Sequence, residues 1–237
     1  MQRLTKKVNL RKKRRKQGQH NRIETTSADL PNNSSILSNP VETVLSNNGM
    51  YESIKETSLI SLFGHFEVID KEGHDITKQF TPLLKEIFLM ILIYTFKDGK
   101  GISSDSLYET IWADKPTKDA RNNFSVNIVK LKSVLEKVGS ISISKESGKW
   151  RFEILDNSIK LDYQQYFNLL NQKPSTIDKN FIINLMSIIK KGSFLREAHY
   201  AWLDDSKASV SDLVISTILA YTAKANIQSE PDLILKL

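Results

Sequence analysis

Residues 120–137 read ARNNFSVNIVKLKSVLEK, and their apolar side chains follow the period of an amphipathic helix. These side chains are spaced at i, i+4, i+7 and i+11 and so form one buried stripe: Phe124, Ile128, Leu131 and Leu135. Asparagine is a mediocre helix former, because its amide competes for backbone hydrogen bonds. We therefore expect the amides of Asn122, Asn123 and Asn127 to serve a function outside the helix.

Short strands and two further helices are expected before this helix. Apolar side chains alternate through residues 59–69, a pattern that predicts two or three short strands. Thr81 precedes Pro82, and a capping residue followed by proline is typical of the start of a helix. We expect Ser103 or Ser104 to cap a second, shorter helix before the quoted one.

A β-hairpin is predicted after the quoted helix. Residues 141–154 read ISISKESGKWRFEI, and they alternate on both sides of a small polar tip at residues 146–148. Three cations stand around this tip: Lys145, Lys149 and Arg151. Strands, three helices and a basic hairpin in this order predict a winged helix-turn-helix.

The fold class expected from these elements is α+β. Residues 58–157 are predicted to form the winged helix-turn-helix, with an N-terminal antiparallel β-sheet and the C-terminal β-hairpin as its wing. Residues 158–237 are predicted to form an all-α unit, with helices at 163–170, 178–191 and about 196–225. The middle helix is apolar on most of its surface, so we expect its neighbours to enclose it.

Positive charge is concentrated in two segments. Residues 1–22 hold ten Lys or Arg and no acid, so the net charge of +7 for the whole chain leaves −3 for the rest. Residues 117–151 carry eight basic and three acidic side chains, whereas residues 59–116 carry six basic and nine acidic ones. The locally positive part of the predicted domain is therefore the quoted helix with the hairpin.

Residues 1–57 have the composition of a linker that does not fold, basic at first and then rich in Asn, Ser and Thr. The basic run from Lys6 to Lys16 has three interpretations: an arm on DNA, a polybasic segment beside a membrane, or a tail that keeps the protein soluble. The second makes the chain the cytoplasmic part of a membrane-anchored sensor. The absence of cysteine and of a secretory signal agrees with a cytoplasmic protein.

An enzyme is not expected. The four histidines, at positions 20, 65, 74 and 199, share no ligand spacing, and His65 and His74 fall on strand and turn positions where exposed histidine is usually incidental. The sequence contains no Gly-rich phosphate loop, nucleophile elbow or paired-carboxylate motif. We therefore expect no catalytic residue, no metal site and no cofactor.

The quoted helix has the chemistry of a DNA reader. In a helix-turn-helix the last helix enters the major groove, where asparagine binds adenine through two hydrogen bonds and lysine addresses guanine or phosphate. Polar residues on the outer face of a helix are ordinarily only solvated. Val126 and Val129 also lie on that face, and exposed β-branched residues suit thymine methyl groups or a protein partner.

Several motifs in this order resemble a known family. They are SLISLFGHFEV, TPLLKEIFLMILIYTFKDGKGISSDSLYETIWAD, ARNNFSVNIVKLKSVLEK and ISISKESGKWRFEI. Together they resemble the OmpR/PhoB-type winged-helix domain, and more closely its version in SARP-type bacterial regulators. LDYQQYFNLL and GSFLREAHYAWLDDSKASVSDLVISTILAYTAK look like the start of the bacterial transcriptional activation domain, which is similar to tetratricopeptide repeats. The resemblance covers roughly residues 58–225.

The resemblance implies a sequence-specific transcriptional regulator that binds double-stranded DNA. Residues 117–138 would be its recognition helix and residues 141–154 its wing, with activation through RNA polymerase and often a homodimer on direct repeats. It implies base contacts from Asn123, Val126, Asn127 and Lys130, and phosphate contacts from Arg121, Lys132, Lys149 and Arg151. Asn122 and Lys145 complete the candidate DNA-binding set. Val129 departs from the family, where arginine or lysine is common.

A protein-interaction module is the alternative from another class. In this interpretation the winged helix uses Val126 and Val129 to bind a protein, and the helical unit is a scaffold for an assembly. Salt dependence separates the two interpretations, because contacts to several phosphates weaken steeply with salt and an apolar contact does not.

Overall fold

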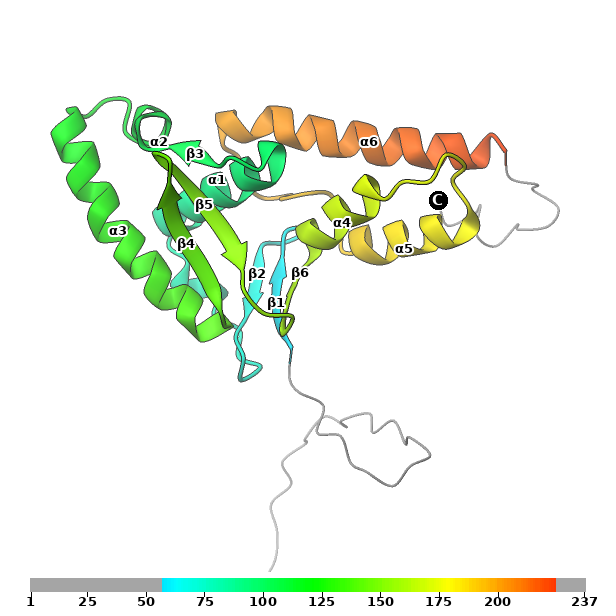
Figure 1. Ribbon diagram of the computed structural model, residues 1–237, viewed down its shortest axis with the longest axis horizontal. Helices are drawn as coiled ribbons and strands as arrows, with labels where there is room; N and C mark the ends of the chain where they lie inside the picture. Colours follow the sequence, from blue (N-terminus) through cyan, green and yellow to red (C-terminus); the bar gives the residue numbers. More distant parts are fainter. Residues whose placement is uncertain (1–56, 225–237) are drawn as a thin grey trace, which may run out of the picture. The chain divides into compact units, whose positions relative to one another are not determined.

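The computed structural model of the protein describes residues 57–224 (Figure 1). Within this range the chain forms six α-helices and two three-stranded β-sheets. The basic run from Lys6 to Lys16 lies outside the described residues. No helix between residues 57 and 224 is long and apolar enough to cross a membrane.

The first sheet has the strand order β2-β1-β6. β1 (Ser58–Ser61) pairs antiparallel with β2 (Glu67–Ile69), as predicted, but β6 (Ile159–Leu161) pairs parallel with β1. The expected antiparallel sheet is therefore a mixed one. β6 was not predicted from the sequence. It has three residues, of which the first and last are buried, and so short a stretch shows too little alternation to be recognised.

α1 (Pro82–Asp98) is the centre of the hydrophobic core. The Thr81 hydroxyl accepts a hydrogen bond from the Leu84 N–H, and Pro82 occupies the first helical position, as predicted. The helix ends at Gly99, whose φ of 70° is the left-handed conformation that glycine adopts easily. α1 is apolar on most of its surface, and other elements of the fold accordingly bury or half-bury most of its side chains.

A short strand and two helices follow α1. β3 (Ile102–Ser103) leads into α2 (Ser104–Ile111), and the Ser103 hydroxyl accepts a hydrogen bond from the Ser106 N–H at 3.0 Å. α3 (Thr117–Val138) begins directly after Pro116. Its predicted stripe is confirmed, since all four members are buried: Phe124, Ile128, Leu131 and Leu135.

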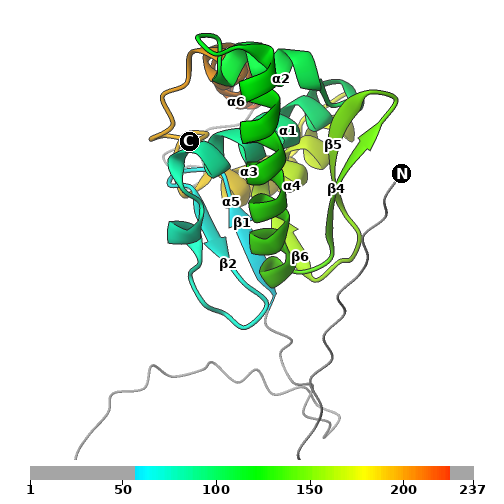
Figure 2. The ribbon, with the colours of Figure 1, turned by 90° about the vertical axis from the view of Figure 1, so that its left-hand side faces the viewer.

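The predicted hairpin is confirmed as β4 (Ile141–Glu146) and β5 (Lys149–Ile154), with β3 paired on the other side of β5. Trp150 fixes its position beside the helices. The Trp150 ring lies 5.0 Å from the Phe124 ring of α3, and its indole N–H donates to the Ser104 hydroxyl of α2 at 3.1 Å. These two contacts hold the hairpin beside α3, as Figure 2 shows.

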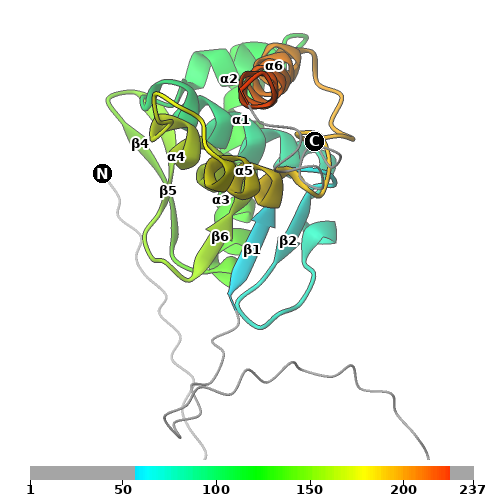
Figure 3. The same cartoon turned by 90° about the vertical axis from the view of Figure 1, so that its right-hand side faces the viewer.

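Three helices follow the hairpin and β6 (Figure 3). α4 (Asp162–Asn171) and α5 (Lys179–Ile189) lie close to their predicted ranges. The prediction that neighbours enclose α5 was wrong for Ile183, whose side chain is 43% exposed. α6 (Asp204–Thr222) begins eight residues later than the predicted start near residue 196.

The late start of α6 has a long-range cause. Phe194 forms a β-bridge with Phe63, and the Leu195 N–H donates to the Leu62 carbonyl at 2.6 Å. Extended backbone paired to a strand segment cannot at the same time be helical. A short 3₁₀ turn, Ala201–Leu203, then leads into α6.

Asp162 ties the helical segment to the first sheet. Its buried carboxylate accepts hydrogen bonds from the N–H groups of Leu62 and Phe63 at 2.8 to 3.0 Å, and from the Ser61 hydroxyl at 3.0 Å. β6 adds a second connection through its pairing with β1. The division into units at residues 157 and 158 stays a prediction, and these contacts join the two segments.

Candidate nucleic-acid interface

The middle of the α3 face that points away from the core is uncharged. Its residues recur at i, i+4, i+7 and i+11 on the side opposite the buried stripe, and all are exposed: Asn122, Val126, Val129 and Ser133. We call them the outer stripe. The valine side chains are 55% exposed at position 126 and 66% at position 129. The sequence therefore places two apolar groups where a solvated helix ordinarily carries charge.

Exposed cations flank the outer stripe on both sides. Lys130 and Lys137 lie on one flank, and Lys137 donates to the Gln79 side chain at 2.9 Å beside the first sheet. Arg121 and Lys132 lie on the other flank. An uncharged centre with positive flanks matches the major groove, where base edges lie between two rows of phosphates.

Asn123 and Asn127 have a role within the helix. The Asn123 side-chain NH₂ donates to the Asp119 carbonyl at 2.9 Å, and that of Asn127 donates to the Asn123 carbonyl at 2.8 Å. Both residues are half-buried at the edge of α3. These bonds within the helix were not expected from the sequence, and their i to i−4 spacing is the signal that could have shown them. A function of the amides outside the helix stays a prediction. Asn122, by contrast, is exposed on the outer stripe.

The three cations of the hairpin differ in their surroundings. Lys145 is exposed, with its ammonium 6.0 Å from the centre of the Trp150 ring. Arg151 pairs with Glu146 at 2.9 Å, so its charge is already balanced on the hairpin. Lys149 is half-buried, and its charge is one of several influences that lower the pKa of Asp98, after the hydrogen bond from the Lys100 N–H. Of the three, Lys145 is therefore the best placed to contact a phosphate.

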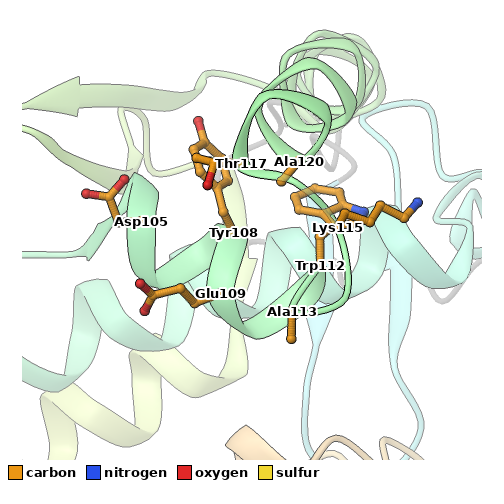
Figure 4. A pocket seen from close by; sticks show the side chains of 8 residues that line it. All are labelled: Asp105, Tyr108, Glu109, Trp112, Ala113, Lys115, Thr117 and Ala120. Carbon is orange, nitrogen blue, oxygen red and sulfur yellow. The ribbon is translucent and has the colours of Figure 1, made fainter.

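Sequence reasoning missed a pocket between α2 and α3 (Figure 4). This open pocket of about 510 Å³ has carboxylates from one side of α2 at its edge, at Asp105 and Glu109. The remaining lining residues are Tyr108, Trp112, Ala113, Lys115, Thr117 and Ala120. The acidic balance of residues 59–116 was the available signal, and it places negative charge beside the start of the positive helix.

One set of metal-type ligands converges in the described part of the chain. The ligand atoms of Asp70, Glu72 and His74 lie within 4.8 Å of one another, in the turn after β2. Burial raises the pKa of the Asp70 carboxyl, but hydrogen bonds from the His74 and Glu72 N–H groups outweigh burial and lower it overall. The histidine that sequence reasoning took as incidental thus lies beside two carboxylates. Exposed acidic groups such as Glu72 are common without an ion, and the hydrogen bonds from the Glu72 and His74 N–H groups to the Asp70 carboxylate bring the three residues together within the turn.

Comparison with known proteins gives one structural match. No family model and no curated protein matches the sequence. The solved structure of Mycobacterium tuberculosis EmbR in complex with a low affinity phosphopeptide matches 71% of this chain, with a TM-score of 0.51 and 16% sequence identity. The chain shares the fold of part of EmbR. It spans 44% of the EmbR chain, and at this identity the likeness concerns the fold alone.

Proposed function

We propose that the protein is a sequence-specific DNA-binding regulator of transcription of the SARP type. In this proposal residues 58–157 form a winged helix-turn-helix, with α3 as the recognition helix and the β4–β5 hairpin as the wing. The observation that carries the proposal is the outer stripe of α3, uncharged and exposed between positive flanks, with a basic hairpin beside it. The fold shared with part of EmbR supports it.

Each candidate residue has a place in the proposed complex. The outer stripe faces base edges, and Asn123 and Asn127 lie at its rim with one amide hydrogen each already bonded to the backbone. Lys130 lies on a flank of the stripe, so the proposal assigns it to a phosphate. The other proposed phosphate contacts come from Arg121, Lys132, Lys145, Lys149 and Arg151. Arg151 has to leave Glu146 to make its contact, and we expect it to contribute least.

Three further partners belong to the proposal. RNA polymerase would contact the protein beside the DNA, where the acidic edge of the α2–α3 pocket is exposed. A second copy of the chain would give a homodimer on repeated DNA sites. In the same proposal, residues 158–237 form the activation-domain-like helical unit. The basic run from Lys6 to Lys16 would bring a cytoplasmic regulator close to a membrane if the chain is part of a membrane-anchored sensor.

A protein-interaction module is the second candidate function. The observation that favours it is again the exposure of Val126 and Val129, because apolar side chains on a helix face also suit a protein groove. The two candidates differ in their response to salt. DNA affinity falls steeply as salt rises, since each neutralised phosphate releases counterions, whereas apolar contact persists.

A selection from random duplex DNA tests the proposal. The full chain is incubated with a duplex library and excess non-specific competitor, so that generic binding by the basic run does not enrich any sequence. We expect a defined motif to be enriched, and we expect the enrichment to fall in the double variant Asn122→Ala, Lys130→Ala, which removes one proposed base contact and one proposed phosphate contact. The matched control is Asn184→Ala, Lys190→Ala, which removes the same two residue types from exposed positions at α5.

Two results would overturn the proposal. One is a full chain that enriches no sequence. The other is a motif that the α3 variant still selects as well as the α5 control does, because DNA would then be read by another surface.

A further inference from the structure

The outer stripe of α3 is unusual in what it lacks. It offers one amide, one hydroxyl and two isopropyl groups, and no cation, from Asn122, Ser133, Val126 and Val129. Helix stability does not explain the valines, because a β-branched side chain loses rotamer freedom in a helix and lysine or glutamate is a better helix former. Core packing does not explain them either, since both are more than half exposed.

The four base pairs differ in which of these groups they accept. Guanine presents two acceptors in the major groove, and its commonest partner is an arginine or lysine. Thymine is the base that presents an apolar group there, its C5-methyl, and adenine pairs with an asparagine amide. A stripe made of valine and asparagine, with its cations on the flanks, therefore fits A·T pairs better than G·C pairs.

The spacing of the valines also fits neighbouring base pairs. Positions 126 and 129 are three residues apart, which is about 4.5 Å along a helix axis, and successive bases of one strand rise by about 3.4 Å. One valine can therefore contact one thymine methyl while the other contacts the next. Asn122 lies one turn before Val126 on the same stripe and is an exposed residue, whereas Asn123 and Asn127 are half-buried and each donates from its amide to the helix backbone.

We propose that α3 reads an A·T-rich site, with Val126 and Val129 packed on thymine C5-methyl groups and Asn122 hydrogen-bonded to adenine. The inference rests on the proposed function and adds the class of sequence that the helix selects. Selectivity then comes from burial of methyl groups and one amide, and the flanking cations supply affinity without base preference.

Replacement of thymine by deoxyuridine tests this inference. The exchange removes the C5-methyl and leaves the pairing groups in place. The full chain is titrated against the enriched duplex and against duplexes with single T→U exchanges. At contacted positions we expect about a fourfold loss of affinity for each methyl removed, from the transfer free energy of one buried methylene-sized group.

The variants identify which side chain meets each methyl. In Val126→Ala the affinity is expected to become insensitive to one T→U exchange and to keep its sensitivity to the other, and Val129→Ala should show the reverse. Ser133→Ala, on the same stripe, is the matched control and should keep both sensitivities. Circular dichroism confirms that each variant keeps its helix content.

The outcomes separate the inference from the function that it rests on. A G·C-rich motif, or an A·T-rich motif whose T→U exchanges leave the affinity unchanged, overturns the reading of thymine methyls while the protein remains a sequence-specific DNA binder. Absence of any preferred sequence overturns the proposed function, and the inference with it. Sensitivity to T→U that survives in both valine variants overturns the assignment to α3.

Discussion

α3 and α6 are the longest helices of the described chain, with 22 and 19 residues, and both expose apolar side chains opposite their buried stripe. On α6 these are Ile215 and Leu219, 54% and 61% exposed. The charges around the two apolar faces differ in sign. α3 carries five basic and two acidic residues, whereas α6 carries three acidic residues and one lysine.

The difference in charge separates two uses of an apolar helix face. In the proposed complex, phosphates would attract the flanks of α3, so that its valines could approach a base, whereas the same phosphates would repel the carboxylates of α6. An exposed apolar stripe alone therefore does not indicate DNA binding, and the charge beside it decides the class of partner. We assign DNA to α3 for this reason and expect α6 to leave DNA untouched.

The largest expected effect on DNA affinity comes from a negative charge placed on the exposed apolar face of α3, compared with the same change on α6. Val126→Glu should lower the affinity for the enriched duplex at least about 100-fold, because a carboxylate facing the groove repels the phosphates and loses hydration. Ile215→Glu, the matched change on α6, should leave the affinity within a factor of two. Fluorescence anisotropy measures both. Equal losses in the two variants would remove the distinction between the helices.

The next effect concerns the connection between the two regions. Asp162→Ala leaves the N–H groups of Leu62 and Phe63 buried without their acceptor, and we expect a loss of about 2 kcal/mol in the free energy of unfolding. Urea denaturation followed by tryptophan fluorescence measures it. Asp178→Ala, which removes the cap of α5, is the control and should cost about 1 kcal/mol. Equal small losses would mean that Asp162 does not hold the helical segment to the sheet.

Local and long-range features differ in how far the sequence predicts them. The Thr81 cap, the α3 stripe and the hairpin depend on neighbours within a few residues, and all are confirmed by the structure. β6 and the segment at Phe194 depend on pairing with residues 101 and 131 positions away, and no local pattern marks them. In the candidate site, too, the features set by near neighbours in the sequence are the ones that could be predicted.

Within the candidate site, the period of α3 was enough to place its outer stripe. The intrahelical bonds of Asn123 and Asn127 could have been expected from their i to i−4 spacing, whereas the Glu146–Arg151 pair depends on the register of the hairpin strands and needed coordinates. The acidic pocket beside α2 needed them as well, since its lining comes from two helices and the loop between them.

A smaller effect tests the flanks of the α3 stripe. Lys130→Ala should weaken binding a few-fold for all sequences alike and reduce the slope of log affinity against log salt by about one, as expected for one lost phosphate contact. Lys207→Ala removes the one lysine of α6 and should change neither the affinity nor the salt slope. An altered sequence preference in Lys130→Ala, with the salt slope unchanged, would place Lys130 on a base instead.

The smallest effect is confined to the loop between the hairpin and β6. Hydrogen bonds from the side chain and N–H of Ser158 and from Ser140 lower the pKa of Asp156 to about 2. Its contribution to stability is therefore present above the ordinary pKa of 3.8 and is lost as pH falls toward 2. NMR titration of the side-chain carboxyl measures the pKa, and Ser158→Ala should raise it. A titration near the ordinary value would mean that this loop is not closed by Asp156.

Amide NMR of the full chain with the enriched duplex tests the central claim most directly. The account predicts that the largest shift changes fall in residues 117–138 and at the hairpin tip, and that α6 is unaffected. Changes concentrated in α6, or small changes spread evenly over the chain while the duplex is bound, would contradict the assignment of α3 as the DNA-reading helix.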